Sequence, residues 1–166
     1  QGIYANTRES GVEWERPGSV EIMYPDGSVE DFQGNCGVRI YGGVGRYPQY
    51  KKHSLRLLFK TIYGANKLEH PLFGPEATDQ FDSVILRAQF NYSWHIGNTQ
   101  ENNQAQYLRD EWFRQTHHDM GQLSSHGMFA HVYLNGLYWG MYNVVERPNA
   151  DFCSSYYGGE KPDWDV

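Results

Sequence analysis

The chain has no long apolar run, few cysteines and no excess of positive charge over its 166 residues. Because a helix that crosses a bilayer needs about 20 consecutive apolar residues, the sequence predicts no transmembrane helix. The 14 Lys and Arg against 20 Asp and Glu give a net charge of -6. That balance argues against a nucleic-acid binder, which normally carries a basic patch and a high pI. The length suits one domain, residues 1–166, with a core of its own.

Only two cysteines, Cys36 and Cys153, occur in the chain. Two thiols carry almost no information about redox compartment, and they could either pair in a disulfide or stay apart as buried thiols. The sequence is otherwise rich in aromatic residues, at 16%, and poor in charged residues, at 20%. Such a composition is typical of a rigid, turn-rich domain and argues against disorder.

Short apolar segments separated by turn residues predict a mainly antiparallel sheet with one or two helices, an α+β domain. Strands are expected over 19–24, 29–32, 37–41, 51–60, 83–88, 129–134 and 137–146. The last two strands flank Asn135-Gly136, a dipeptide that suits a type I′ hairpin turn. Helices are expected over 104–116 and shortly after Pro148, and residues 98–103 are typical of a polar loop.

The stretch from Gly37 to Gly64 is the most informative part of the sequence. It reads as a strand, a glycine-rich turn and a basic second strand. Gly42 and Gly43 lie in the turn, where the lack of a side chain lets backbone amides approach an anion closely. A lysine or arginine nearby supplies the charge or the guanidinium fork that phosphate oxygens bind. Because the chain as a whole is acidic, this cation cluster is local, and it predicts a polyphosphate site.

Three cations are the candidate phosphate ligands: Lys52 on the second strand, with Arg39 and Arg46 across the turn. On the two-residue period of a strand, Lys52 shares a face with Ser54 and Arg56, and this polar face could line a cleft. The alternative is a solvated basic face that merely balances nearby acidic residues.

Glu146 and a histidine-rich group are further candidate site residues, and each also has a structural interpretation. Glu146 ends the last strand just before Arg147-Pro148, where it could contact a nucleotide or pair with a cation. A structural salt bridge at the strand end is an equally good interpretation. A histidine-rich group could suggest a metal site, but its spacing fits no compact tetrahedral pattern, so we predict no metal ligand there. The group comprises His117, His118, Asp119, His126 and His131.

Motifs along nearly the whole chain resemble the CotH kinase-like family, named for a spore-coat protein. Any one of these strings is weak, but their number and order make the resemblance specific. In chain order they are Trp14-Glu15-Arg16-Pro17, Gly37-Val38-Arg39-Ile40, Gly42-Gly43, Lys52-His53-Ser54-Leu55-Arg56-Leu57-Leu58-Phe59-Lys60, Tyr63-Gly64, Pro71-Leu72-Phe73, Leu86-Arg87-Ala88, Tyr107-Leu108-Arg109-Asp110-Glu111-Trp112, Tyr133-Leu134-Asn135-Gly136-Leu137-Tyr138-Trp139-Gly140, Glu146-Arg147-Pro148, Gly158-Gly159 and Asp163-Trp164-Asp165-Val166.

The resemblance implies an atypical protein-kinase-like fold, of which this chain is similar to the amino-terminal lobe. It also implies a bacterial protein, secreted or at the cell surface, that uses ATP and Mg to phosphorylate serine on protein substrates. The family's catalytic Asp and Asn and its metal-binding Asp are expected beyond Val166. We therefore expect no catalytic residue and no phosphoryl transfer in this isolated chain, and an open face covered by the rest of the kinase domain or another subunit.

Within this resemblance, the sequence also offers the carboxylates that a kinase-like cation would pair with, at Asp110 and Glu111. Neighbouring Arg109 and Arg114 could neutralise both acids locally, and this simpler interpretation is favoured. The alternative for the whole chain is a non-catalytic structural or adhesion module of an extracellular bacterial multidomain protein. A weaker possibility is glycan binding through the aromatic side chains of the last hairpin.

Overall fold

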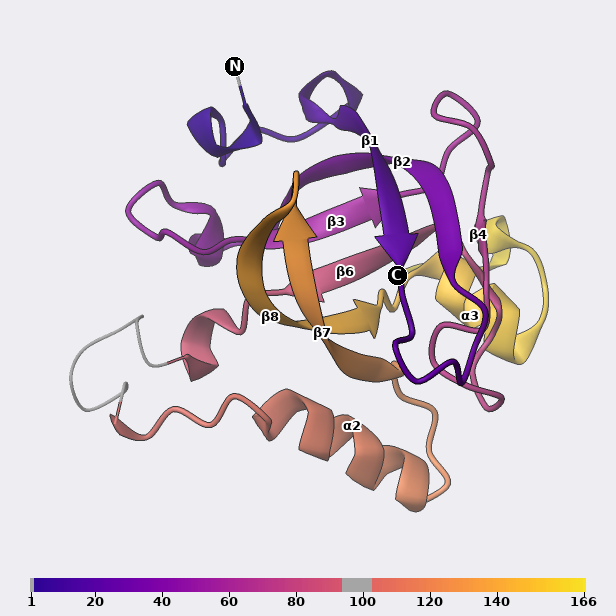
Figure 1. Ribbon diagram of the computed structural model, residues 1–166. Helices are drawn as coiled ribbons and strands as arrows, with labels where there is room; N and C mark the ends of the chain where they lie inside the picture. Colours follow the sequence, from indigo (N-terminus) through magenta and orange to yellow (C-terminus); the bar gives the residue numbers. More distant parts are fainter. Residues whose placement is uncertain (1, 94–102) are drawn as a thin grey trace.

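The computed structural model describes residues 2–93 and 103–166, which form an antiparallel sheet curled into a half-barrel, with helices beside it (Figure 1). The six strands of the sheet follow the order β1-β2-β3-β6-β8-β7. Their bounds are Arg16–Ile22 (β1), Phe32–Tyr41 (β2), Ser54–Leu58 (β3), Ser83–Arg87 (β6), Leu137–Glu146 (β8) and Gly127–Leu134 (β7). A separate pair joins β4 (Leu68–Glu69) to β5 (Gln80–Phe81). This architecture confirms the α+β expectation.

Two α-helices accompany the sheet among the described residues. The helix α2, Arg109–Asp119, runs below the sheet in Figure 1, and α3, Ala150–Tyr157, lies near β4. Asn149 caps α3, because its side chain accepts a hydrogen bond of 3.0 Å from the backbone N–H of Phe152. No helix in the described part is long and apolar enough to cross a membrane.

The structure confirms the hairpin most closely and corrects several boundaries. Asn135 and Gly136 both have positive φ, 51° and 79°, as a type I′ turn requires. The strand predicted over 51–60 is shorter and spans only Ser54–Leu58, of which 55–58 pair on both sides. The two strands predicted over 29–32 and 37–41 are replaced by one long strand, β2. The helix predicted over 104–116 begins and ends later, at Arg109 and Asp119. The loop predicted over 98–103 lies outside the described residues except for its last position.

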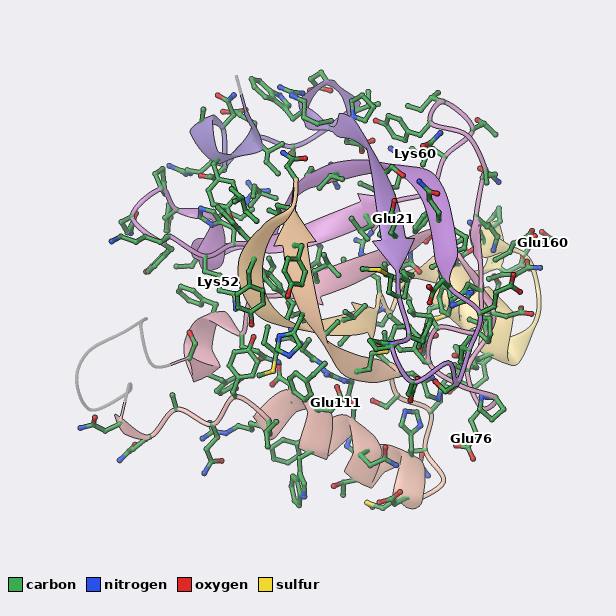
Figure 2. All side chains as sticks on the ribbon, in the orientation of Figure 1. Glu21, Lys52, Lys60, Glu76, Glu111 and Glu160 are labelled. Atoms are coloured by element: carbon green, nitrogen blue, oxygen red, sulfur yellow. The ribbon has the colours of Figure 1, made fainter. Side chains whose placement is uncertain are left out.

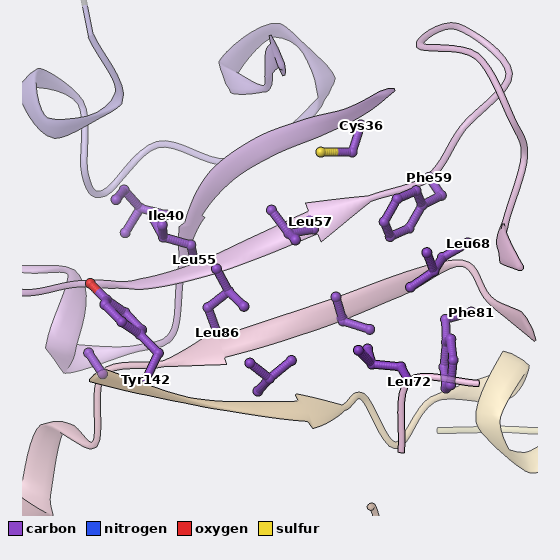
Figure 3. Close-up of a cluster of buried hydrophobic side chains, with 13 residues drawn as sticks. Cys36, Ile40, Leu55, Leu57, Phe59, Leu68, Leu72, Phe81, Leu86 and Tyr142 are labelled. Atoms are coloured by element: carbon purple, nitrogen blue, oxygen red, sulfur yellow. The ribbon is translucent and has the colours of Figure 1, made fainter. Parts of the chain in front are cut away.

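The hydrophobic core fills the inside of the curled sheet (Figure 3). Alternation along the strands sends Leu55 and Leu57 of β3 inward, together with Val84 and Leu86 of β6. Each such side chain contributes about 1.5–3 kcal/mol when it is fully buried. Cys36 lies in this core, and neither it nor Cys153 forms a disulfide. The opposite, outer face of the sheet is therefore free to carry polar side chains.

Candidate functional site

Two arginines stand opposite each other on the outer face of the sheet. Arg39 of β2 is the register partner of Arg56 of β3, and Arg56 is in turn the partner of Ile85 of β6. Directly opposed residues share one face of a sheet, so the two guanidinium groups emerge side by side. Like charges in this position destabilise a sheet, and an anion bound between them would remove that cost.

Arg56 is the buried member of this pair, at 8% exposure. Its Nη2 donates a hydrogen bond of 2.9 Å to Ser83 Oγ, whereas its Nε is buried without a partner among the described residues. Burial lowers the pKa of Arg56 to about 10, and the positive charges of Arg147 and Arg39 act in the same direction, with Asp82 opposing them. A buried guanidinium with unused donors, surrounded by other cations, is suited to bind oxyanions.

Arg39 is only loosely engaged by its nearest carboxylate. The buried carboxylate of Glu15 accepts hydrogen bonds of 2.8 and 2.9 Å from Lys60 Nζ and one of 2.8 Å from Tyr63 OH. The Nη1 atom of Arg39 lies 3.9 Å from the same carboxylate, beyond hydrogen-bonding distance. Because Glu15 is satisfied by two other donors, Arg39 can turn toward a ligand without leaving a buried acid unpaired.

A third arginine of the outer face connects the sheet to α2. Arg87, at the end of β6, forms an ion pair with Asp110 in the first turn of α2. One residue further on, Glu111 lies on the side of α2 that faces the sheet (Figure 2). Its Oε2 accepts hydrogen bonds from Arg114 at 2.6 Å and from the buried amide of Asn143 at 2.8 Å. The local pairing expected for Glu111 is thus observed, while Asp110 binds a cation from the sheet.

A glycine on β7 allows this close approach of helix and sheet. A Cβ atom at Gly127 would lie 2.5 Å from Oε2 of Glu111 and 2.9 Å from Cγ1 of Val145. Both distances are shorter than real contacts of a Cβ atom, so any side chain here would push α2 away from the sheet.

The glycine-rich turn predicted to bind phosphate lies at the end of β2. A Cβ atom at Gly43 would have no heavy atom within 4 Å, and one at Gly42 would meet only Arg46 Cγ, at 4.0 Å, so the space above both residues is open. Arg46 follows in a short 3-10 turn, Val44–Arg46, and its guanidinium donates to the backbone carbonyl of Arg8. The turn is therefore accessible, but the cation predicted to complete it is engaged by the N-terminal segment.

Lys52 is engaged by the sheet (Figure 2). Its Nζ donates a hydrogen bond of 2.7 Å to the carbonyl of Met141 and lies 4.3 Å above the ring of Tyr142. It also lies 3.5 Å from the hydroxyl of Tyr107. Burial lowers the pKa of Lys52, and no carboxylate among the described residues pairs with it. In this arrangement Lys52 joins three segments of the chain that are far apart in the sequence.

Glu146 is the last residue of β8, whereas Met141, the partner of Lys52, lies in the middle of the same strand. Glu146 is 3% exposed and accepts hydrogen bonds from His126, through the backbone N–H at 2.7 Å and Nδ1 at 2.9 Å. The hydroxyl of Tyr156 donates a third, at 2.6 Å. Because strands rise about 3.3 Å per residue, five residues separate Glu146 from Met141 by about 16 Å. The structure does not bring Glu146 and Lys52 together, and Glu146 is instead bonded to His126 and Tyr156.

The predicted residues are thus distributed over three places, and the structure adds cations that the sequence argument did not assign. Arg39 lies in the outer-face pair. At one end of the sheet lie Gly42, Gly43, Arg46 and Lys52. Glu146 lies at the other end. The added cations are Arg56, Arg87 and Arg147. The two-residue period already placed Arg56 on a polar face, but its pairing with Arg39 depends on a register that no local pattern specifies.

The carboxylates and histidines of the described part do not assemble a metal site. No group of three or more His, Cys, Asp or Glu side chains there is arranged to hold an ion. His118 and His126 instead stack on each other, with ring centroids 4.3 Å apart. We therefore derive no step through a metal ion.

The fold and this site define a small antiparallel α+β domain with three arginines, Arg39, Arg56 and Arg87, on the outer face of its sheet. The chain belongs to the CotH kinase protein family, because the family model of that description matches residues 38–163. The match begins within β2 and extends through α3, so it includes both arginines of the outer-face pair. In a comparison with curated proteins, no relative matches the chain.

Proposed function

We propose that the chain is the nucleotide-binding portion of a CotH-type kinase, which transfers phosphate from ATP to serine residues of protein substrates. The observation that carries this proposal is the opposed pair of Arg39 and Arg56, with the buried Nε of Arg56 unpartnered. Guanidinium groups bind phosphate oxygens through two parallel hydrogen bonds, and a polyphosphate can occupy both members of the pair. The negative charge of the polyphosphate offsets the repulsion between the two arginines.

The ion pair that connects β6 to α2 supports the same proposal. In protein kinases a strand lysine that contacts nucleotide phosphates is held by a glutamate of the following helix. Here Arg87 ends β6 and pairs with Asp110 of α2, an α-helix that follows β6 in the chain after the short 3-10 helix Phe90–Tyr92. The helix is followed by the hairpin of β7 and β8, and β8 returns to pair with β6.

The work of these residues is to bind and orient phosphates rather than to exchange protons. Phosphoryl transfer depends mainly on positioning and on neutralising the charge that develops on the transferred group. The nucleotide, when bound, supplies the phosphoryl group. Arg56 is fixed in place by Ser83 and contributes charge at low dielectric, while Arg39 can move toward the ligand. Serine-containing proteins remain the proposed acceptors.

We also propose an extracellular or cell-surface location in a bacterium, which rests on the family resemblance. Fractionation of the native cells with an antibody against the chain tests it. Recovery in the culture medium or on the cell surface is the expected result, and recovery only with cytoplasmic markers would contradict it.

Thermal unfolding in the presence of Mg-ATP tests the nucleotide proposal. A ligand at 100 times its dissociation constant adds about 2.7 kcal/mol to the free energy of unfolding. We expect stabilisation by Mg-ATP that weakens in Arg39→Gln. The control is Arg109→Gln. The guanidinium of Arg109 is already engaged by an aromatic ring, because it lies 4.7 Å over the ring of Tyr92. Absence of any nucleotide effect on the unsubstituted chain would favour the alternative, a non-catalytic structural or adhesion module.

A further inference from the structure

A cleft of about 310 Å³ opens between α2, the segment after β4 and the beginning of β7. None of the arginines of the outer-face pair lines it, so it is distinct from the proposed nucleotide site. The cleft is lined by Phe73, Glu76, Glu111, Gln115, His118 and His126, among others. Figure 2 labels the two carboxylates, Glu76 and Glu111.

The imidazole groups of the cleft are held rigidly and leave one nitrogen unused. His126 is fixed by Glu146, and His118 stacks on it with an angle of 20° between the rings. The Nε2 atom of His118 is buried and has no hydrogen-bond partner among the described residues. A neutral imidazole has one nitrogen that accepts a hydrogen bond, so His118 can offer an acceptor to a bound group.

Both carboxylates of the cleft have unused oxygens. Glu76 forms no hydrogen bond or ion pair with any described residue, and Glu111 uses Oε2 for Arg114 and Asn143, which leaves Oε1 available. Two carboxylates and an imidazole acceptor beside an apolar wall suit a planar cation with many donors. A guanidinium group carries five N–H donors in one plane and packs well against rings, whereas an ammonium group has three donors and is more strongly hydrated.

The flank of α2 beside the cleft indicates that this guanidinium comes from a protein. Leu108 and Trp112 are 60% and 63% exposed. At 100° per residue, they lie on the side of the helix adjoining Gln115, which lines the cleft. Exposed apolar side chains next to a polar pocket are typical of protein interfaces, where tryptophan and arginine contribute strongly. We propose that the cleft receives an arginine side chain of a protein partner that lies along α2 and covers Trp112.

Titration of the chain with N-acetyl-arginine amide, followed by NMR, tests the guanidinium site. We expect saturable shifts of the amide signals of Gln115 and Gly127, with a dissociation constant of about 1 mM. The neutral analogue N-acetyl-citrulline amide has nearly the same shape and should not bind. Binding should weaken at least tenfold in Glu76→Gln, and also in His118→Phe, which keeps a stacked ring but lacks Nε2. The control is Glu69→Gln, on β4 and exposed.

Absence of saturable binding, or equal binding of the citrulline analogue, would overturn the guanidinium assignment. The protein origin is tested with N-acetyl-Arg-Leu-Leu amide. This peptide should bind more tightly than the single amino acid, and Trp112→Ala should abolish the gain. Equal affinity for the two probes, or a gain that survives Trp112→Ala, would overturn the assignment to a protein partner. Neither result bears on Mg-ATP binding, which Arg39→Gln tests separately.

Discussion

Arg39 and Arg56 face each other across β2 and β3, although no carboxylate lies within hydrogen-bonding distance of either guanidinium in the described part of the chain. Sheets normally avoid like charges at directly opposed positions. Besides burial, the positive charge of Arg39 contributes to the lowered pKa of Arg56, and a bound anion would offset this repulsion.

Replacement of Arg56 should therefore abolish Mg-ATP binding without lowering the free energy of unfolding. In Arg56→Met an apolar side chain of similar length replaces an unpaired cation, so we expect the free energy of unfolding to stay constant or rise by about 1 kcal/mol. The Mg-ATP effect on the melting temperature should disappear. Urea unfolding with and without nucleotide measures both quantities. A loss of stability together with unchanged nucleotide binding would assign Arg56 a structural role.

The ion pair between the sheet and α2 should be measurable by a double-mutant cycle of Arg87→Gln and Asp110→Asn. Because the arginine side chain is 39% exposed, we expect a coupling energy of only about 0.5–1 kcal/mol. Each single substitution should also weaken Mg-ATP binding, since one removes the guanidinium of Arg87 and the other removes the carboxylate that holds it. Additive effects on stability would show that the two side chains act independently.

Gly127 should tolerate no side chain, because α2 approaches β7 at this point. In Gly127→Ala the new methyl group meets Glu111 and Val145, and we expect a loss of about 1–3 kcal/mol in the free energy of unfolding. Gly2→Ala is the matched control, since its Cβ would enter open space and its backbone is extended, with φ -70° and ψ 163°. Chemical denaturation of both variants provides the comparison, and equal stabilities would contradict the close approach.

Asp151 at the start of α3 should contribute to stability at neutral pH. Burial alone would raise the pKa of this carboxyl, but hydrogen bonds from Lys161 and Lys67 lower it below the ordinary value of 3.8. The folded state therefore holds this proton less tightly than the unfolded state. The resulting stabilisation is present above the unfolded pKa and is lost as the pH falls through the folded value.

In the variant Asp151→Asn, the free energy of unfolding at pH 7 should be about 1–3 kcal/mol lower than in the unsubstituted chain. This variant should also show a weaker fall in stability between neutral pH and pH 3 than the unsubstituted chain. Asp119→Asn, on the exposed side of α2, serves as the control. Identical pH profiles of the Asp151 variant and the unsubstituted chain would contradict this account.

Local patterns in the sequence predicted those parts of the fold that depend on local chemistry. The Asn135-Gly136 turn and its flanking strands were predicted because the turn type needs residues that adopt positive φ. The helix boundary was wrong, because α2 begins at Arg109 and ends at Asp119. The apolar side chains Leu108 and Trp112 are exposed. The side of α2 that meets the sheet is instead polar and includes Glu111.

The site was less predictable because its contacts join distant parts of the chain. Lys52 looked free to bind phosphate, and its hydrogen bond to a carbonyl 89 residues away has no local signature. Glu146 pairs with His126, 20 residues earlier, through a hairpin register that a strand prediction does not provide. The opposed arginines were each visible as cations, but only the pairing of β2 with β3 brings them together.

The most direct test of the central claim is the location of the phosphates. Mn-ATP broadens the NMR signals of nearby amides, because the paramagnetic ion binds to the phosphates and so reports their position. We expect the strongest broadening at the amides of Arg39 and Arg56, and little at Asp26, which lies in the turn between β1 and β2, at the far end of β2 from Arg39. Broadening confined to Gly42 and Gly43 would move the phosphates to the glycine-rich turn, and no broadening at any residue would contradict nucleotide binding by this chain.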